Sequence, residues 1–235
     1  EARNTVVSKI TASIKTLPAA ADKIRQLNKV LVDKNDYNQA AVSSAGTVAT
    51  EGNLPCECLC ALNAGTFVEP VCEGYARAFK VLCDQLGIPC VLVDGQAESY
   101  PGQGQKGPHM WNYVQMEDDK WYAVDVTWND PTGGSQTTEM QSKWLLLGSS
   151  TPVNEKNDTF ISTHPVSNAP TEDAALTYEN GPELSLERYV PMNPLPEDAT
   201  VRITDAQDKD FPYNSFDVGT KLKAQPESFP TDATP

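Results

Sequence analysis

The sequence predicts an α+β fold, in which helices in the first half of the chain pack on an antiparallel sheet. Apolar residues recur at helical spacing over residues 2–35 and again after Cys72, whereas residues 109–128 are rich in the aromatic and β-branched residues that favour strands. The chain has 235 residues, 39% of them apolar, which is enough for one sizeable core. We therefore expect one globular domain over residues 1–168, with its core at about 20–165.

The N-terminal segment is expected to form two short helices. Val6, Ile10 and Ile14 share one helical spacing and a second apolar series starts at Ile24, but Pro18 separates them. Residues 37–55 are rich in Ala, Ser, Thr and Gly without a clear period, so they are predicted to be a loop.

The stretch PVCEGYARAFKVLCDQLGIPC predicts a helix that begins at Cys72 and is followed by a strand. Its apolar residues fall on one helical stripe, at Tyr75, Phe79, Leu82, Cys83 and Leu86. Gly87 and Pro89 are typical of the end of a helix. The β-branched run at 88–93 then predicts a short buried strand.

Two further stretches, HMWNYVQM and KWYAVDVTW, are separated by the polar residues EDDK and predict a hairpin. A turn of three or five residues around Glu117 would place His109 directly opposite Asp125, on one face of the sheet. A two-residue turn at 118–119 would pair Glu117 with Lys120 and send the two side chains to opposite faces. Both registers remain open on the sequence alone, but if His109 and Asp125 act together, the turn must be the odd one.

The remainder of the chain changes character after about residue 168. Residues 143–148 are a candidate for one more strand. Pro, Asp, Glu, Thr and Asn then dominate, so residues 169–235 are predicted to be a C-terminal extension, partly extended or disordered. TVRIT is its best strand candidate.

The charge excludes two classes of partner. The net charge is -14 and the isoelectric point is about 4.5. Nucleic acids and anionic membranes are bound by clustered Lys and Arg, so we expect no nucleic-acid partner. The sequence also lacks an apolar run of the length that crosses a bilayer, so we expect no membrane insertion.

Cys72 is the strongest candidate for chemistry. The N-terminus of a helix and a neighbouring imidazole both favour the thiolate that acts as a nucleophile. We expect His109 to be the base, Asp125 to orient it, and the backbone N–H of Cys72 to stabilise an oxyanion, with a second donor from the loop near Tyr37. His164, before a proline, is predicted to fix a loop by hydrogen bonding.

The other cysteines are assigned no catalytic role. Cys83 lies on the apolar helix stripe and Cys90 enters a strand, so both are expected to be structural. Cys56, Cys58 and Cys60 do not have the spacing of a zinc site. No calcium-loop pattern is present either, so no metal or other cofactor is expected.

In their order and spacing, VCEGYARAFKVLCDQLGIPC, HMWNYVQ and WYAVDVTWNDP resemble the transglutaminase-like superfamily, particularly its bacterial members. The resemblance implies a papain-like fold, with a nucleophile helix on an antiparallel sheet. It assigns Cys72, His109 and Asp125 as a catalytic triad, and Trp128 and Asn129 complete the motif. The CECLC stretch departs from the family pattern, and the chain beyond about residue 170 matches no part of it.

The function implied is acyl transfer from an amide bond through a thioester, which passes either to water or to an amine. The expected substrate is a protein or peptide with Gln or another amide donor. Trp111, Trp128, Asn129 and Tyr37 are the candidate cleft residues. We expect an extracellular or cell-surface location, with any signal sequence outside this chain.

Two alternatives stand beside this function. The first is a non-catalytic binding or surface-adaptor module with the same fold. The second is a redox protein that uses Cys56, Cys58 and Cys60.

Overall fold

A computed structural model describes residues 2–43, 54–63, 68–98, 106–130, 137, 140–167, 181–191, 201–204 and 223–226. It contains two compact units, Glu1–Val190 and Pro191–Pro235. Most of the predicted C-terminal extension lies outside the described residues.

The N-terminal segment forms two helices, as predicted, α1 (Ala2–Ile14) and α2 (Ala20–Lys34). The helix α2 buries one apolar stripe that includes Ile24, Leu27 and Leu31. The expected loop contains a short helix, α3 (Gln39–Ser43), so the prediction of a loop is wrong for those residues.

The predicted helix at Cys72 is confirmed as α5 (Cys72–Gln85) and follows the single-turn helix α4 (Cys58–Ala61). Its stripe of Tyr75, Phe79 and Leu82 is fully buried. Gly87 follows the helix with a φ of 70°, a left-handed conformation that glycine adopts without strain.

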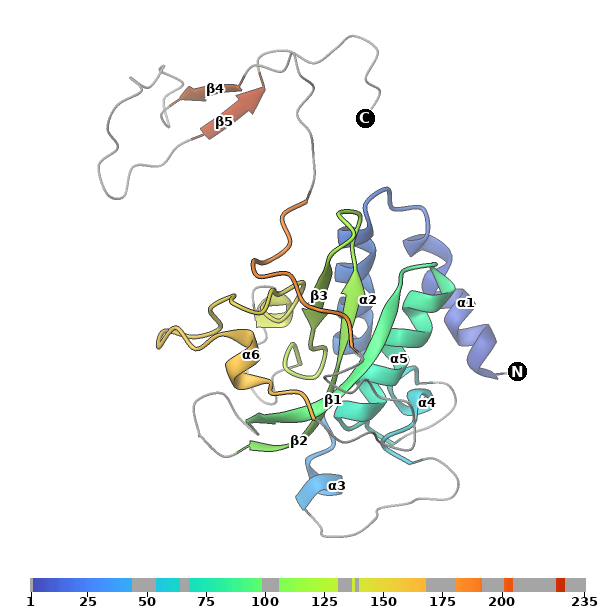
Figure 1. Ribbon diagram of the computed structural model, residues 1–235. Helices are drawn as coiled ribbons and strands as arrows, with labels where there is room; N and C mark the ends of the chain where they lie inside the picture. Colours follow the sequence, from blue (N-terminus) through green and yellow to red (C-terminus); the bar gives the residue numbers. More distant parts are fainter. Residues whose placement is uncertain are drawn as a thin grey trace. The chain divides into compact units, whose positions relative to one another are not determined.

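Three antiparallel strands follow in the order β1-β2-β3, at Cys90–Glu98, Lys106–Gln115 and Trp121–Val124. The hairpin prediction is confirmed by β2 and β3. The α+β class and the helix-on-sheet arrangement are therefore as expected (Figure 1).

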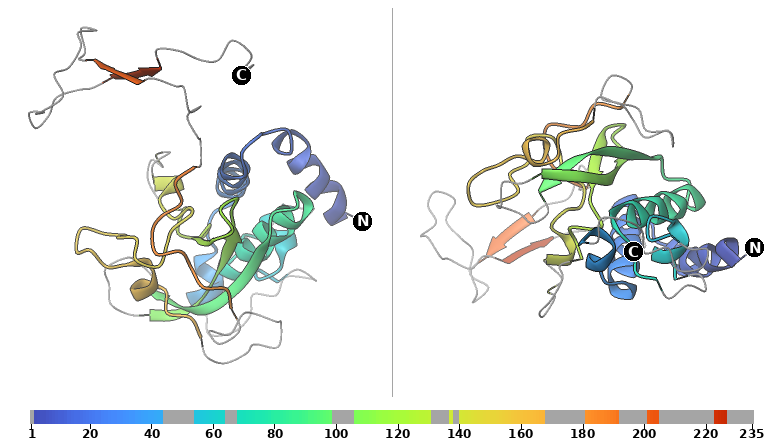
Figure 2. Two further views of the ribbon diagram at one scale, coloured as in Figure 1. Left: turned by 45° about the horizontal axis from the view of Figure 1, so that its top comes forward. Right: turned by 90° about the horizontal axis from the view of Figure 1, so that it is seen from below.

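The sheet separates two apolar clusters because successive side chains of a strand point to opposite faces. One cluster joins α1, α2 and α5 to Val114 and Val124 of the sheet. The other contains Trp111, Tyr113 and Phe160 and lies on the face that carries α6 (Phe160–Thr163). Figure 2 shows α1, α2 and α5 on one side of the sheet and α6 on the other.

Residues 143–148 do not form a strand. The short 3-10 helix η1 (Met140–Ser142) precedes them, and Leu147 makes a single antiparallel bridge to Ala123. Leu146 has a φ of 54°, which an extended strand does not allow, so the pairing stops there.

Residues 181–190, which the composition assigned to the extension, belong to the first unit. Leu184 bridges Trp121 in parallel, and the hydroxyl of the buried Tyr189 donates a hydrogen bond of 2.9 Å to Glu117. The second unit contains an antiparallel pair of strands, β4 (Val201–Thr204) and β5 (Lys223–Pro226). The strand predicted at TVRIT is confirmed by β4.

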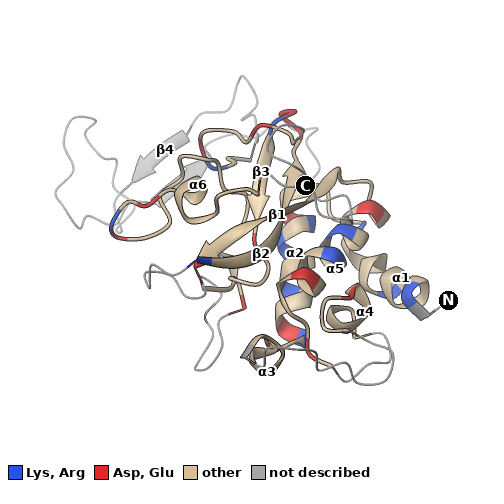
Figure 3. Ribbon diagram, turned by 60° about the horizontal axis from the view of Figure 1, so that its bottom comes forward, with Lys and Arg blue, Asp and Glu red and all other residues tan. Residues whose placement is uncertain are grey.

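Basic residues (Lys, Arg) and acidic residues (Asp, Glu) both occur along α2 and α5 (Figure 3). On α5, Lys80 pairs with Asp84 and Arg77 with Glu73, each one helical turn apart. Among the described residues, no helix is both long enough and apolar enough to cross a bilayer.

Candidate active site

The turn between β2 and β3 has three residues, 117–119. Gln115 pairs with Trp121, and the N–H of Met116 donates to the carbonyl of Lys120 at 3.0 Å. Asp119 closes the turn with a φ of 61°. The odd length predicted is confirmed, but the turn is centred one residue later than expected.

This register places Asp125 across from Trp111 instead of His109. The predicted direct opposition is therefore wrong. His109 lies two residues along β2, on the same face and diagonal to Asp125. Diagonal neighbours of this kind remain within reach of long side chains.

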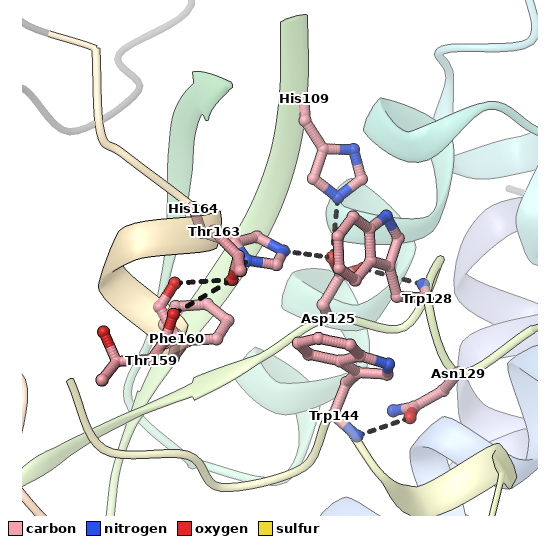
Figure 4. A network of polar contacts seen from close by, with 9 residues as sticks. All are labelled: His109, Asp125, Trp128, Asn129, Trp144, Thr159, Phe160, Thr163 and His164. Atoms are coloured by element: carbon pink, nitrogen blue, oxygen red, sulfur yellow. Dashed lines mark hydrogen bonds and ion pairs between the residues drawn. The ribbon is translucent and has the colours of Figure 1, made fainter. Parts of the chain in front are cut away.

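The two side chains meet in the interior. The Nε2 atom of His109 lies 2.7 Å from Oδ2 of Asp125, which is fully buried (Figure 4). Burial alone lowers the pKa of an imidazole, but the charge of Asp125 and this hydrogen bond raise the pKa of His109 to about 10. Burial raises the pKa of a carboxyl group, yet the imidazoles around Asp125 hold its pKa well below the ordinary range.

Asp125 is fixed by the turn that it begins. Its Oδ1 accepts a hydrogen bond of 3.0 Å from the N–H of Trp128. The buried side chain of Asp130 accepts a hydrogen bond from the hydroxyl of Tyr75, on α5. The helix that starts at Cys72 is thus joined directly to the turn that holds the carboxylate.

Cys72 is partly exposed at the first position of α5. The first N–H groups of a helix have no intrahelical partner, and the side chain of Val71 caps none of them here. These N–H groups lie at the end of α5 that carries Cys72. Burial raises the pKa of the Cys72 thiol, but the hydrogen bond and charge of His109, with a backbone hydrogen bond from Met110, lower it below the ordinary value. Because Nε2 of His109 faces Asp125, we infer that Nδ1 is the nitrogen that forms the hydrogen bond with Cys72.

Tyr37 lies beside the same thiol. The next residue, Asn38, is bound to the segment that precedes Cys72, because its N–H donates to the carbonyl of Pro70 at 2.9 Å. The Asn38 amide also donates to the carbonyl of Glu69 at 2.9 Å. Burial, the charge of Cys72 and a hydrogen bond with its side chain raise the pKa of Tyr37, and a hydrogen bond with the Cys72 backbone opposes this rise only in part.

The remaining predicted cleft residues are largely buried. The ring of Trp111 is 1% exposed and stacks on His109 with centroids 5.9 Å apart. Asn129 is fully buried, and its amide donates to Asn28 at 2.9 Å and accepts from the N–H of Trp144 at 2.8 Å. Both residues support the site from within the protein. Trp128 is partly buried, and its ring lies 6.1 Å from that of His109.

His164 is the residue of the site that the sequence did not reveal. It is fully buried, and its Nε2 lies 3.1 Å from the same Asp125 oxygen that His109 contacts (Figure 4). The expectation of a hydrogen-bonding role fits, but the partner is the carboxylate of the candidate site. No sequence spacing could have joined His164 to Asp125, because the two residues are 39 positions apart and meet only through tertiary contacts, such as the bridge of Val166 to Gly95 of β1.

Within the described part of the chain, the potential metal-ligand atoms of His109, Asp125 and His164 lie within 4.8 Å of one another. Both imidazoles are within hydrogen-bond distance of one Asp125 oxygen, which accounts for their arrangement. The expectation that no metal takes part stays a prediction.

All six cysteines lie in the described residues, and none of them forms a disulfide there. Burial raises the pKa values of Cys56 and Cys58, in the direction opposite to that of Cys72. Burial and the neighbouring Cys90 thiol raise the pKa of Cys83 strongly. Of these four thiols, Cys72 is the one whose surroundings favour the thiolate.

Comparison with known proteins agrees with the geometry. A family model described as the transglutaminase-like superfamily matches residues 5–126, more than half of the chain. Kyphoscoliosis peptidase of Mus musculus is 32% identical over 99 residues, and that of Homo sapiens is 31% identical over the same length. These matches cover 40% of this chain and only 13% of each relative.

One solved structure, described as the crystal structure of a TGase, is similar with a TM-score of 0.44 and 18% identity. The similarity covers 58% of this chain and 34% of that one.

Proposed function

The chain belongs to the transglutaminase-like superfamily, and on that premise we propose that it is a cysteine enzyme that acts on amide bonds through a thioester. Cys72 is the nucleophile, His109 the general base and acid, and Asp125 the group that orients His109. The carrying observation is the buried contact of 2.7 Å between His109 and Asp125, together with the lowered pKa of Cys72.

The resting state is a thiolate–imidazolium pair. His109 keeps its proton at neutral pH because its pKa is raised to about 10, while the pKa of Cys72 is lowered. The thiolate attacks the amide carbon, and Nδ1 of His109 donates its proton to the leaving nitrogen. Water or an amine then attacks the thioester carbon and gives up a proton to His109. The carbon–sulfur bond breaks, which restores the Cys72 thiolate.

The tetrahedral oxyanion needs two donors. The backbone N–H of Cys72, at the start of α5, is the first. We assign the hydroxyl of Tyr37 as the second, because it lies against Cys72 and its raised pKa keeps it protonated. Trp128, beside His109, is the remaining candidate for contact with the substrate.

The substrate class is a protein or peptide with a Gln side chain or another amide. We propose hydrolysis slightly ahead of transfer to an amine, and the name of the mammalian relatives, kyphoscoliosis peptidase, supports that order. The chain spans only 13% of those proteins, so their activity is not transferred to it.

One incubation separates the outcomes. The chain is mixed with a casein-type protein and a labelled primary amine, and ammonia release, amine incorporation and backbone cleavage are measured together. We expect at least one of the three to occur, to vanish in Cys72→Ser and to persist in Cys58→Ser, the matched control at a thiol with a raised pKa. No product from any donor, with an unreactive Cys72, would instead favour a non-catalytic module.

A further inference from the structure

The proposed mechanism uses one imidazole, yet the Asp125 carboxylate contacts two. Its Oδ2 lies 2.7 Å from Nε2 of His109 and 3.1 Å from Nε2 of His164, and its Oδ1 accepts from the N–H of Trp128. His164 is as deeply buried as Asp125 itself. A buried carboxylate with three N–H donors is held in its ionised form.

The surroundings of His164 determine where its proton lies. A carboxylate only accepts hydrogen bonds, so Nε2 of His164 must carry a hydrogen. Burial lowers the pKa of His164, which keeps the ring neutral, so Nδ1 is an acceptor. The hydroxyl of Thr163 lies 2.9 Å from that Nδ1, but its single proton has a second acceptor, the carbonyl of Phe160, also at 2.9 Å.

Aromatic rings hold the imidazole in this orientation. Phe160 stacks on His164 with centroids 4.3 Å apart and an interplanar angle of 13°. Trp128 and Trp111 meet it edge-on, with centroids 4.6 and 5.2 Å away. These rings leave the imidazole one polar direction toward Thr163 and one toward Asp125.

From these contacts we infer that His164 is a positioning residue of the site, held in its Nε2–H tautomer by the Asp125 carboxylate, which it in turn fixes beneath His109. The inference rests on the proposed function, because it concerns the same site. It extends the array by one member, in the order His164, Asp125, His109, Cys72. Its physical effect is to stop Asp125 from rotating and from taking up a proton.

The tautomer can be tested without any activity. The chain contains only two histidines, so an imidazole ¹H–¹⁵N correlation spectrum shows two ring systems, which His164→Gln assigns. We expect His164 to stay neutral with its proton on Nε2 throughout the range of about pH 5 to 8 in which an ordinary histidine titrates. Titration of His164 in that range, or a proton on its Nδ1, would overturn the assignment.

The positioning role is tested by two substitutions at one site. His164→Gln retains an N–H donor toward Asp125, whereas His164→Leu removes it. In the Leu variant we expect kcat to fall by at least about tenfold, because small misplacements of catalytic groups cost rate steeply. We also expect the acid limb of the pH profile of Cys72 alkylation to move upward, because a less firmly held Asp125 stabilises the His109 imidazolium, and through it the thiolate, less well.

The Gln variant should keep both the turnover and the pH profile close to those of the natural chain. Equal behaviour of the Gln and Leu variants would contradict the positioning role. If His164→Leu does not fold, His164→Phe provides the same test, because it keeps a ring stacked on Phe160 and removes the donor to Asp125. A Cys72 of ordinary pKa in the natural chain would refute the proposed function, while the histidine spectrum still decides the inference separately.

Discussion

His109 and Asp125 meet diagonally across the sheet, with Nε2 2.7 Å from Oδ2. If the β2–β3 register is continued one residue past Val124, Asp125 falls opposite Trp111, whose ring stacks on His109. The imidazole therefore stacks on an indole while its Nε2 reaches the carboxylate. This arrangement retains the shared face that the chemistry requires and adds an apolar wall behind the base.

Because the pKa of His109 is raised, the free energy of unfolding is expected to fall as the pH becomes alkaline. The folded value is about 10 and the ordinary value is 6.5, so the imidazolium stabilises the folded chain fully below pH 6.5, and this contribution is lost as the pH rises through about 10. Urea unfolding should show a stability difference between the natural chain and His109→Gln that shrinks toward the alkaline end. A difference that is constant with pH would contradict the ion pair.

Asp125→Asn should abolish most of the turnover. The amide places an N–H where His109 needs an acceptor, which favours the wrong imidazole tautomer, so kcat should fall by at least about 10²-fold. Asp84→Asn is the control, because Asp84 is exposed on α5 and pairs only at the surface with Lys80. Turnover of Asp125→Asn within a few-fold of the natural chain would remove Asp125 from the mechanism.

Tyr37→Phe should separate oxyanion stabilisation from nucleophile activation. Removal of one oxyanion donor costs roughly 10²–10³-fold in kcat. Alkylation of Cys72 forms no oxyanion, so its rate should change by less than about threefold. If both rates fall equally, Tyr37 acts on the thiolate and another group is the second donor.

Gly74→Ala should destabilise the fold beside the nucleophile. A Cβ at this position would lie 2.4 Å from the carbonyl oxygen of Pro55 and 3.0 Å from Cβ of Pro70. Overpacking of this kind costs about 1–3 kcal/mol in the free energy of unfolding. A Cβ at Gly107 meets nothing within 4 Å, so Gly107→Ala should stay within about 0.5 kcal/mol. Equal unfolding midpoints for the two variants would contradict the close approach of Pro55.

The sequence predicted the elements whose signals are local. Helical spacing and Gly87 located α5, and alternating aromatic residues located the hairpin. The requirement that His109 and Asp125 share a face predicted an odd turn, which the structure has. The centre of the turn could not be predicted, because the left-handed conformation of Asp119 carries no clear sequence signal.

Features that depend on tertiary packing escaped the sequence. Leu184 and Tyr189 are buried in the first unit although they follow a long stretch in which Pro, Asp, Glu, Thr and Asn dominate. His164 looked like a loop residue because nothing near it in the sequence indicates the buried Asp125 that it contacts. Such contacts come from chain segments that meet only after the sheet has formed.

Alkylation kinetics decide whether Cys72 is a thiolate because His109 lies against it. Iodoacetamide labelling over a range of pH, with the modified peptides mapped by mass spectrometry, gives the pKa of each thiol. We expect Cys72 to react at a pH well below that required by Cys56 and Cys58, and His109→Ala to abolish this difference. A Cys72 that reacts no earlier than those thiols, or whose profile is unchanged in His109→Ala, would contradict it.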